Sequence, residues 1–413
     1  MRYAAPSDPS PPCPQSILGL APLMRRALAG EDLRPLSQAL LQRADADPHE
    51  AGALLDAAIL CEFQGRAALA ANLRREALRL CRHYRVQGCA QTPALRVLAL
   101  KAAGPLLANT PIECLLADGD IALEVYYVGE DLPDPETLPE HDLLFVAIGE
   151  SDAHQPLLAH WAERLRAWPR PVINDPRQII ASARDRLWQR LQGLPGVLAP
   201  PVWRLGRAQL ADLAAGQGRE GYGFPLLIRP IDSHAGQGLT RIDRAEDLAA
   251  LLASHPEPTY FVSPFIDYRS PDGWFRKFRL VWIGGQPLPV HLAISERWMI
   301  HYLNAGMDGS AVKRAEEADF FKGFESGFAQ RHAKTLAALH AALGLDYVGI
   351  DGAELPDGRL LLFEADPAMV VHDMDPPAIY PYKLAPMRRL FAAFREFLSG
   401  VSKHRPPGLG QGV

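Results

Sequence analysis

The segment "GIDGAELPDGRLLLFEAD", residues Gly349 to Asp366, holds two apolar runs separated by a turn sequence. Asp351 closes the first run and Glu364 closes the second. Asp366 lies two residues beyond Glu364 and therefore on the same side of an extended chain. We expect a β-hairpin on which the three carboxylates converge. Since Mg²⁺ in proteins binds carboxylate oxygens together with substrate phosphates, this hairpin predicts a divalent metal site. The alternative is that the acidic side chains are only solvated at the strand ends.

A second segment, "LLIRPIDSHAGQGL", places an apolar run and Arg229 directly before a glycine-bearing loop. This order predicts a buried strand followed by a phosphate-binding loop. Gly236 and Gly238 have no side chain, so backbone N–H groups can approach phosphate oxygens closely. The side chains that add hydrogen-bond donors are Ser233 and His234. A glycine-containing surface turn is the alternative.

Strand-like runs and one helix connect these segments. The runs rich in β-branched, aromatic and aliphatic residues are "TYFVSPFID", "FRKFRLVWIGGQPLPVHLAI", "YVGID" and "RLLLFEAD". A long helix is expected from about Glu325 to Leu343, where apolar and histidine side chains recur every four residues. The alternation of strands and helices indicates a chain of the α/β (α+β) class.

Composition limits the class of partner. The chain has 413 residues, a formal net charge of -5 and a pI near 6.2, which gives no electrostatic footprint for nucleic acid or an anionic membrane. No apolar run reaches the roughly 18 residues needed to span a bilayer. The five cysteines all lie at or before Cys114 with no CxxC pair, and the N-terminus lacks the apolar core of a signal peptide. We therefore expect a cytoplasmic protein.

Composition also suggests a domain order. Residues 1–16 are proline-rich and read as a flexible leader, and residues 401–413 read as a disordered tail. Residues 17–110 carry helical periodicity and predict an N-terminal all-α domain that resembles a tetratricopeptide unit, without a 34-residue repeat. Residues 111–175 contain β-rich runs and a helix, and predict a small parallel α/β domain.

From about Asn174 to Leu398 the chain resembles the ATP-grasp superfamily, especially its glutathione-synthetase-like and ribosomal-protein glutamate-ligase-like branch. In those enzymes a basic strand end reaches the nucleotide phosphates, a glycine-rich loop covers them, a hinge binds adenine and carboxylates on a later strand pair bind Mg²⁺. The four parts occur here in that order, as "FPLLIR", "DSHAGQG", "VSPFID" and the carboxylate hairpin. The resemblance implies an ATP-grasp fold for residues 176–400, with the small α/β domain preceding it.

The resemblance also implies roles for individual residues. ATP-binding positions are Arg186, Arg229, Ser233, His234, Gly236, Gly238, Pro264, Phe265, Ile266 and Asp267, of which Asp267 also fits a turn former. Asp351, Glu364 and Asp366 are implied to bind Mg²⁺, with Mn²⁺ as an alternative. Arg229 and Arg279 are implied to be catalytic. This branch usually has lysines at the positions of Arg186 and Arg229 and often asparagine at that of Asp366. Arginine keeps the charge and gains a bidentate fork.

The segment between the hinge and the hairpin is rich in side chains that suit a substrate. Lys277 alternates with Arg279 along one strand face, where a solvated basic face is the alternative. The remaining candidates for substrate contact are His291, Arg297, His301, Asn304 and His372. A histidine near aromatic residues also fits a purely structural role.

The activity implied by the resemblance is ATP-dependent carboxylate-amine ligation through an acyl phosphate, with release of ADP and phosphate. The acceptor class is an amino acid, a small peptide or a peptide terminus, and the N-terminal helices are a place where a protein or peptide partner can bind. No nucleic acid or membrane partner is expected. The alternatives are an ATP-grasp phosphotransferase and a non-catalytic ATP-binding scaffold.

Overall fold

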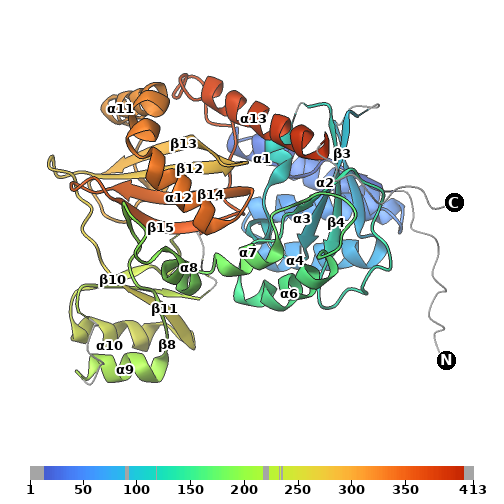
Figure 1. Ribbon diagram of the computed structural model, residues 1–413. Helices are drawn as coiled ribbons and strands as arrows, with labels where there is room; N and C mark the ends of the chain where they lie inside the picture. Colours follow the sequence, from blue (N-terminus) through green and yellow to red (C-terminus); the bar gives the residue numbers. More distant parts are fainter. Residues whose placement is uncertain are drawn as a thin grey trace.

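The computed structural model describes residues 14–88, 93–117, 119–216, 223–231, 233 and 236–403. Within these residues the strands form three sheets, each accompanied by helices, so the predicted mixed α/β class is confirmed (Figure 1). His234, residues 1–13 of the predicted leader and residues 404–413 of the predicted tail lie outside the described residues. Gln15 and Ser16, which the leader prediction included, instead belong to strand β1 (Gln15–Ile17).

Four helices make up the N-terminal part. They are α1 (Leu20–Leu28), α2 (Arg34–Ala46), α3 (Ala51–Phe63) and α4 (Ala67–Leu80). Helix α3 is buried on nearly all sides, because α1, α2, α4 and β1 all pack against it. Helices α3 and α4 flank the turn at Gln64 to Arg66 and pack against each other.

The first sheet has the order β1-β2-β4-β3-β5-β6 among the described residues. Its remaining strands are β2 (His83–Val86), β3 (Leu95–Ala102), β4 (Ile121–Val128), β5 (Leu143–Val146) and β6 (Val172–Ile173). Strand β3 pairs in parallel with both β4 and β5, and β5 pairs in parallel with β6. The helical prediction for residues 17–110 is therefore wrong after Leu80. Strand β3 is buried almost throughout, so it lacks the polar-apolar alternation that marks a half-exposed strand.

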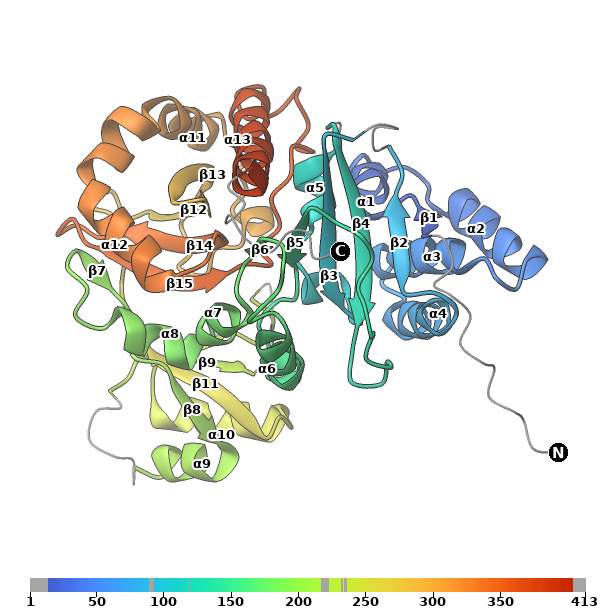
Figure 2. The same cartoon turned by 45° about the vertical axis from the view of Figure 1, so that its right-hand side comes forward.

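The second sheet is antiparallel, with the order β10-β9-β11-β8 in the described chain. Its strands are β8 (Trp203–Gly206), β9 (Leu226–Pro230), β10 (Thr240–Ile242) and β11 (Thr259–Pro264). Helices α9 (Arg207–Ala214) and α10 (Ala245–Ser254) pack on it and share a core of their own with its strands. Together they form a lobe that stands apart from the N-terminal helices in both views (Figures 1 and 2).

The third sheet has the order β13-β12-β14-β15-β7 over the described residues. Its strands are β7 (Val197–Leu198), β12 (Phe275–Ile283), β13 (Gln286–Ser295), β14 (Tyr347–Glu354) and β15 (Leu360–Asp366). Strands β14 and β15 form the predicted hairpin, in which Asp351 lies opposite Glu364. The sheet buries large side chains such as Trp282 of β12, which is completely enclosed.

The helices of the C-terminal half complete the fold. They are α7 (Pro176–Ala181), α8 (Arg184–Leu191), α11 (Ala311–Gly323), α12 (Ala333–Leu343) and α13 (Leu384–Lys403). The helix predicted from 325 to 343 begins earlier than expected, because α11 continues through a π-helical segment, η4 (Phe324–Ala329), toward α12. Smaller elements lie in the connections: α5 (Ile112–Leu116), α6 (Gln155–Arg164), η1 (Leu106–Ala108), η2 (Asp152–His154) and η3 (Tyr302–Asn304).

The N-terminal helices contact the segment that follows β15. Arg25 of α1 forms an ion pair with Asp373 at 2.9 Å, and Val370 and Met374 pack against the core of these helices. The Thr110 hydroxyl donates a hydrogen bond of 2.9 Å to the carbonyl oxygen of Pro367. These contacts bring α1 beside the end of the strand that carries Glu364 and Asp366.

Candidate active site

A cavity of about 740 Å³ lies where the second and third sheets face each other. Strands β9 and β11 contribute its wall on one side, and β12, β14 and β15 contribute the other. The sequence-predicted residues that line it are Arg229, Gly236, Pro264, Phe265, Ile266, Lys277, Arg279, His291, His301, Asp351, Glu364, Asp366 and His372. Residues from every predicted part therefore meet in one cavity.

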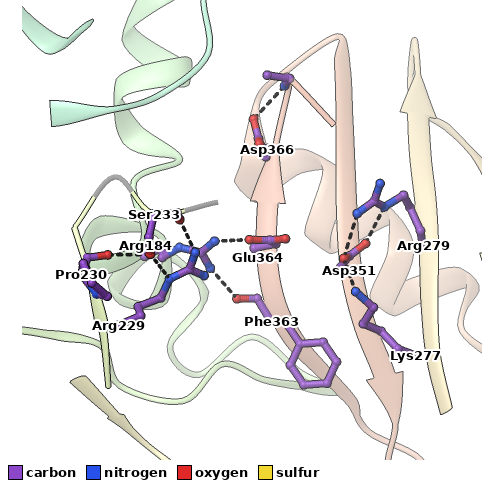
Figure 3. Close-up of polar contacts among 11 residues, drawn as sticks. Arg184, Arg229, Pro230, Ser233, Lys277, Arg279, Asp351, Phe363, Glu364 and Asp366 are labelled. Atoms are coloured by element: carbon purple, nitrogen blue, oxygen red, sulfur yellow. Dashed lines mark hydrogen bonds and ion pairs between the residues drawn. The ribbon is translucent and has the colours of Figure 1, made fainter. Parts of the chain in front are cut away.

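Asp351 is the most buried charged group in the cavity wall, with 2% of its surface exposed. Its carboxylate accepts hydrogen bonds from Lys277 Nζ at 2.7 Å and from Arg279 Nε at 2.7 Å and Nη2 at 3.0 Å (Figure 3). Burial raises the pKa of Asp351, but the charges of Arg279 and Lys277 outweigh burial and hold the pKa well below its usual range. The carboxylate is therefore ionised and fixes both cations on β12.

Glu364 is paired with a residue that the sequence did not indicate. Arg184, the first residue of α8, donates to Glu364 Oε2 and also to the Phe363 carbonyl oxygen at 3.4 Å (Figure 3). Burial raises the pKa of Glu364, but Arg184 and then Arg229 bring the pKa below its usual value. Asp366 lies on the same face of β15, and its Oδ1 accepts the backbone N–H of Ala368 at 2.7 Å.

Asp351, Glu364 and Asp366 differ in how well each can serve as a ligand for a divalent cation. The described chain contains no group of three His, Cys, Asp or Glu side chains arranged to hold a metal ion. Both oxygens of Asp351 accept hydrogen bonds from cations, so this side chain is a poor metal ligand as it stands. Glu364 and Asp366 line the cavity and offer the oxygen ligands that hard divalent cations need. The predicted trio is not gathered as one ligand set, because Lys277 and Arg279 already compensate the buried charge of Asp351.

Arg229 is the last residue but one of β9 and lines the cavity. Its Nε donates to Ser233 Oγ at 3.1 Å and its Nη2 donates to the Ser233 carbonyl oxygen. Burial, followed by the nearby charge of Arg184, lowers the pKa of Arg229 to about 10, so the guanidinium stays charged at neutral pH. Ser233 is therefore a partner of Arg229 and is not among the residues that line the cavity.

Gly236 and Gly238 of the predicted phosphate loop both have a backbone conformation that favours glycine. Gly236 has φ of 75° and Gly238 has φ of 68°, both in the left-handed region. A Cβ at Gly238 would come within 2.7 Å of Pro230 Cδ, so a side chain is excluded there. Gly236 lines the cavity, whereas Gly238 does not line it and lies against Pro230.

The predicted hinge follows β11. Pro264, Phe265 and Ile266 line the cavity. The Phe265 ring packs edge-on against Trp298 with centroids 5.5 Å apart, and its backbone N–H donates to the Pro225 carbonyl oxygen. Asp267 does not line the cavity, and its Oδ1 accepts the backbone N–H of Arg269 at 3.0 Å, so it acts as a turn former.

The predicted substrate residues divide into two groups. Lys277, His291, His301 and His372 line the cavity, whereas Arg297 and Asn304 do not. Burial, followed by the charge of Arg279, lowers the pKa of His291 well below its usual value, so the ring is neutral. Its Nδ1 has no hydrogen-bond partner among the described residues. Burial is also the main reason that the pKa values of His301 and His372 are lowered.

Arg186 is not in the cavity. It is exposed and donates to Gln155 Oε1 at 2.9 Å, whereas Arg184, two residues earlier, lines the cavity and contacts Glu364. Both arginines lie in "RDRLWQRL", so the sequence located the segment but not the residue. One helical residue points about 100° away from the next, and a two-residue shift moves a side chain to the other side of α8.

Lys383 was also missed by the sequence analysis. It lines the cavity with 4% of its surface exposed, donates to Asp375 Oδ2 at 2.9 Å and lies 3.6 Å from Glu317, which is fully buried. Tyr302 donates to Glu317 Oε2 at 2.9 Å. These residues come from three separate segments, namely η3, α11 and the connection between β15 and α13, so no local pattern indicates that they meet.

The chain is similar in sequence and in structure to known proteins. The chain is similar to D-alanine-D-alanine ligases from strains of Acinetobacter baumannii, with 26% identity over 165 residues. The match covers 38% of this chain and 49% of the relative, so the chain spans about half the length of the curated relatives it matches. No protein family model matches the chain. The similarity to these relatives confirms the predicted resemblance to ligases, whereas the tetratricopeptide-like resemblance stays a prediction.

Solved structures of similar proteins carry ligase and ATP-grasp descriptions. The structural match to VanG D-Ala:D-Ser ligase from Enterococcus faecalis covers 75% of this chain and 99% of the VanG chain. Its TM-score is 0.47 and the sequence identity is 14%. A RimK domain ATP-grasp protein from Sphaerobacter thermophilus covers 74% of this chain and 99% of its own, with a TM-score of 0.41 and 16% identity.

Proposed function

We propose that this protein is an ATP-dependent carboxylate-amine ligase that works through an acyl phosphate and releases ADP and phosphate. The observation that supports this most strongly is the cluster of opposite charges in one cavity. Arg184, Arg229, Lys277 and Arg279 line it together with Asp351, Glu364 and Asp366. Phosphoryl transfer needs positioned cations around the phosphates and no protein nucleophile, and this arrangement meets that requirement.

The reaction proceeds in two steps. A carboxylate oxygen of the donor attacks the γ-phosphorus of ATP, the bond to the β-γ bridging oxygen breaks and ADP leaves. The amine then attacks the carbonyl carbon of the mixed anhydride, the bond to the phosphate oxygen breaks and phosphate leaves. The amine loses a proton as the amide forms.

The cations have separate tasks in the first step. Arg229 donates a hydrogen bond to Ser233 and stays charged, so it suits the nucleotide phosphates. Arg279 is held by two hydrogen bonds to Asp351 and suits the phosphoryl group in transfer, where a preorganised charge is most effective. In this proposal Asp351 is a positioning residue that orients Arg279 and Lys277.

A divalent cation, when bound, neutralises charge on the phosphates. Glu364 and Asp366 are the residues that would hold it, and Mg²⁺ is the ion we propose. The pair of Glu364 with Arg184 keeps the carboxylate ionised before the nucleotide binds. Hinge residues Pro264 to Ile266 are proposed to hold the adenine, because they line the cavity with apolar side chains.

The N-terminal helices, the small α/β domain and the ATP-grasp domain remain a proposed division of the chain. No described helix is long and apolar enough to cross a membrane. Location in the cytoplasm stays a prediction from the sequence, as do a protein or peptide partner on the N-terminal helices and the use of Mn²⁺.

The test is product analysis with ATP, Mg²⁺ and paired carboxylate and amine substrates. We expect phosphate, ADP and an amide in equal amounts, with the amide identified by mass spectrometry. Formation of a stable phosphoester in place of free phosphate would contradict the ligase and indicate a phosphotransferase. ATP binding without any turnover over a broad panel would indicate a scaffold.

A further inference from the structure

The mouth of the cavity is unusually apolar. The exposed large hydrophobic side chains of the described residues are Leu28, Leu80, Leu107, Leu303, Val312 and Ile379. Four of these described side chains, Leu28, Leu107, Leu303 and Ile379, line the cavity. Exposed apolar side chains are normal when scattered singly, but four that line the same cavity mark a binding surface.

Two of the four come from the N-terminal part of the chain. Leu28 is the last residue of α1 and is 48% exposed, and Leu107 lies in η1 and is 44% exposed. Met24 and Phe63 of the same helical core also line the cavity. The ion pair of Arg25 with Asp373 holds α1 against the segment after β15. The N-terminal helices therefore form part of the cavity wall.

Leu303 and Ile379 supply apolar surface from the C-terminal half. Leu303 is 84% exposed and lies in η3, and Ile379 is 37% exposed. The exposed carboxylate of Asp308 also lines this opening, and its Oδ1 accepts the backbone N–H of Gly309 at 2.9 Å. An apolar opening with a carboxylate beside it matches a ligand that carries an apolar group and an ammonium group. A fatty acid has no ammonium group that could pair with the Asp308 carboxylate.

We propose that the cavity mouth binds the apolar side chain of an amino-acid or short-peptide substrate, and that α1 and η1 set this specificity. The proposal rests on the ligase function proposed above and names the substrate class. The substrate places an aliphatic or aromatic side chain against this apolar surface. Its ammonium group lies beside Asp308, and its carboxylate lies toward the cations of the interior. Burial of the leucine side chains supplies the affinity.

The test uses the full-length chain with Leu28→Ser and Leu107→Ser combined. Both side chains are about half exposed, so the double variant is expected to fold. The matched control is Leu80→Ser combined with Val312→Ser, because these exposed side chains do not line the cavity. The probe is Nile red, an uncharged dye whose fluorescence rises in apolar sites. Leu-Leu, Gly-Gly and octanoate are then compared as competitors.

We expect the cavity variant to bind the probe about tenfold more weakly than the control variant, since two partly buried leucines are lost. Leu-Leu should displace the probe from the unmodified protein, and Gly-Gly and octanoate should not. Equal probe binding by the two variants would overturn the proposal. Displacement by octanoate, but not by Leu-Leu, would also overturn it.

Turnover provides the second readout. The cavity variant should lose about tenfold in kcat/KM for an apolar dipeptide relative to the control, and less than twofold for Gly-Gly. Equal losses for both peptides would contradict a specificity role. If no peptide supports ADP formation but Leu-Leu still displaces the probe, the ligase proposal fails and the apolar site stands.

Discussion

Replacing Asp351 with asparagine tests the charge balance at the centre of the site. Asp351 is 2% exposed and accepts three hydrogen bonds from Lys277 and Arg279, which are themselves largely buried. Asparagine keeps the shape but removes the negative charge. Two cations then remain close together in a region of low dielectric without a compensating charge. We expect Asp351→Asn to destabilise the protein strongly.

The expected loss in the free energy of unfolding follows from the burial of Lys277 and Arg279. Removing one member of a buried ion pair costs roughly 3–5 kcal/mol, because the other charge stays buried and unpaired. With a denaturant slope of about 3 kcal/mol/M, the urea midpoint falls by about 1–1.7 M. Tryptophan fluorescence is a suitable signal, since Trp282 is enclosed on the same strand as Lys277 and Arg279.

Acidification provides an independent check on the same group. The folded-state pKa of Asp351 lies below the unfolded value of about 3.9. Its stabilising contribution is therefore complete above that unfolded value and is lost as the pH falls through the folded pKa. Asp351→Asn should lose less stability than the unmodified protein when the pH is lowered below about 4.

Glu364→Gln is the matched control for stability. Glu364 and Arg184 are 28% and 24% exposed, so breaking this pair should cost only about 1 kcal/mol. Adding Lys277→Met to Asp351→Asn removes one unpaired cation and should recover part of the loss. An Asp351→Asn midpoint equal to that of Glu364→Gln would refute the role of Asp351 as the anchor of the two cations.

The remaining predictions concern the nucleotide. Glu364→Gln should abolish ATP turnover with Mg²⁺ and leave ATP affinity without metal nearly unchanged, as calorimetry and ADP release can check; near-normal turnover would remove Glu364 from the site. Asp366→Asn should be milder, because asparagine keeps an oxygen ligand. Arg184→Ala should weaken ATP binding about tenfold or more and Arg186→Ala less than twofold, since only Arg184 lines the cavity; equal effects would contradict this. EDTA should stop turnover and excess Mg²⁺ should restore it, and turnover that resists EDTA would count against a metal site.

The carboxylate hairpin could be predicted from the sequence because its information is local. Two continuous apolar runs set the strands, and the two-residue spacing of Glu364 and Asp366 sets their shared face. The positive φ of Gly236 and Gly238 is likewise a local property. These parts of the site depend on neighbours in the sequence.

The features that the sequence did not predict depend on contacts between residues far apart in the chain. Lys383 reaches the cavity from the segment before α13, and its partners Glu317 and Tyr302 lie more than 60 residues away. Strand β3 lies within the range predicted to be helical. Both of its faces are buried, so its sequence lacks the period-two alternation of a half-exposed strand. The contact of α1 with the cavity also depends on the packing of Val370 and Met374, which no local pattern indicates.

The most direct test of the ligase account is interception of the acyl phosphate. The protein is incubated with ATP, Mg²⁺ and a carboxylate donor, and hydroxylamine replaces the amine. If the γ-phosphate moves to a carboxylate, a hydroxamate should accumulate with about one ADP for each hydroxamate. AMP and pyrophosphate would indicate adenylation, and a phosphorylated product that hydroxylamine cannot capture would indicate phosphotransfer. Either result would contradict the account.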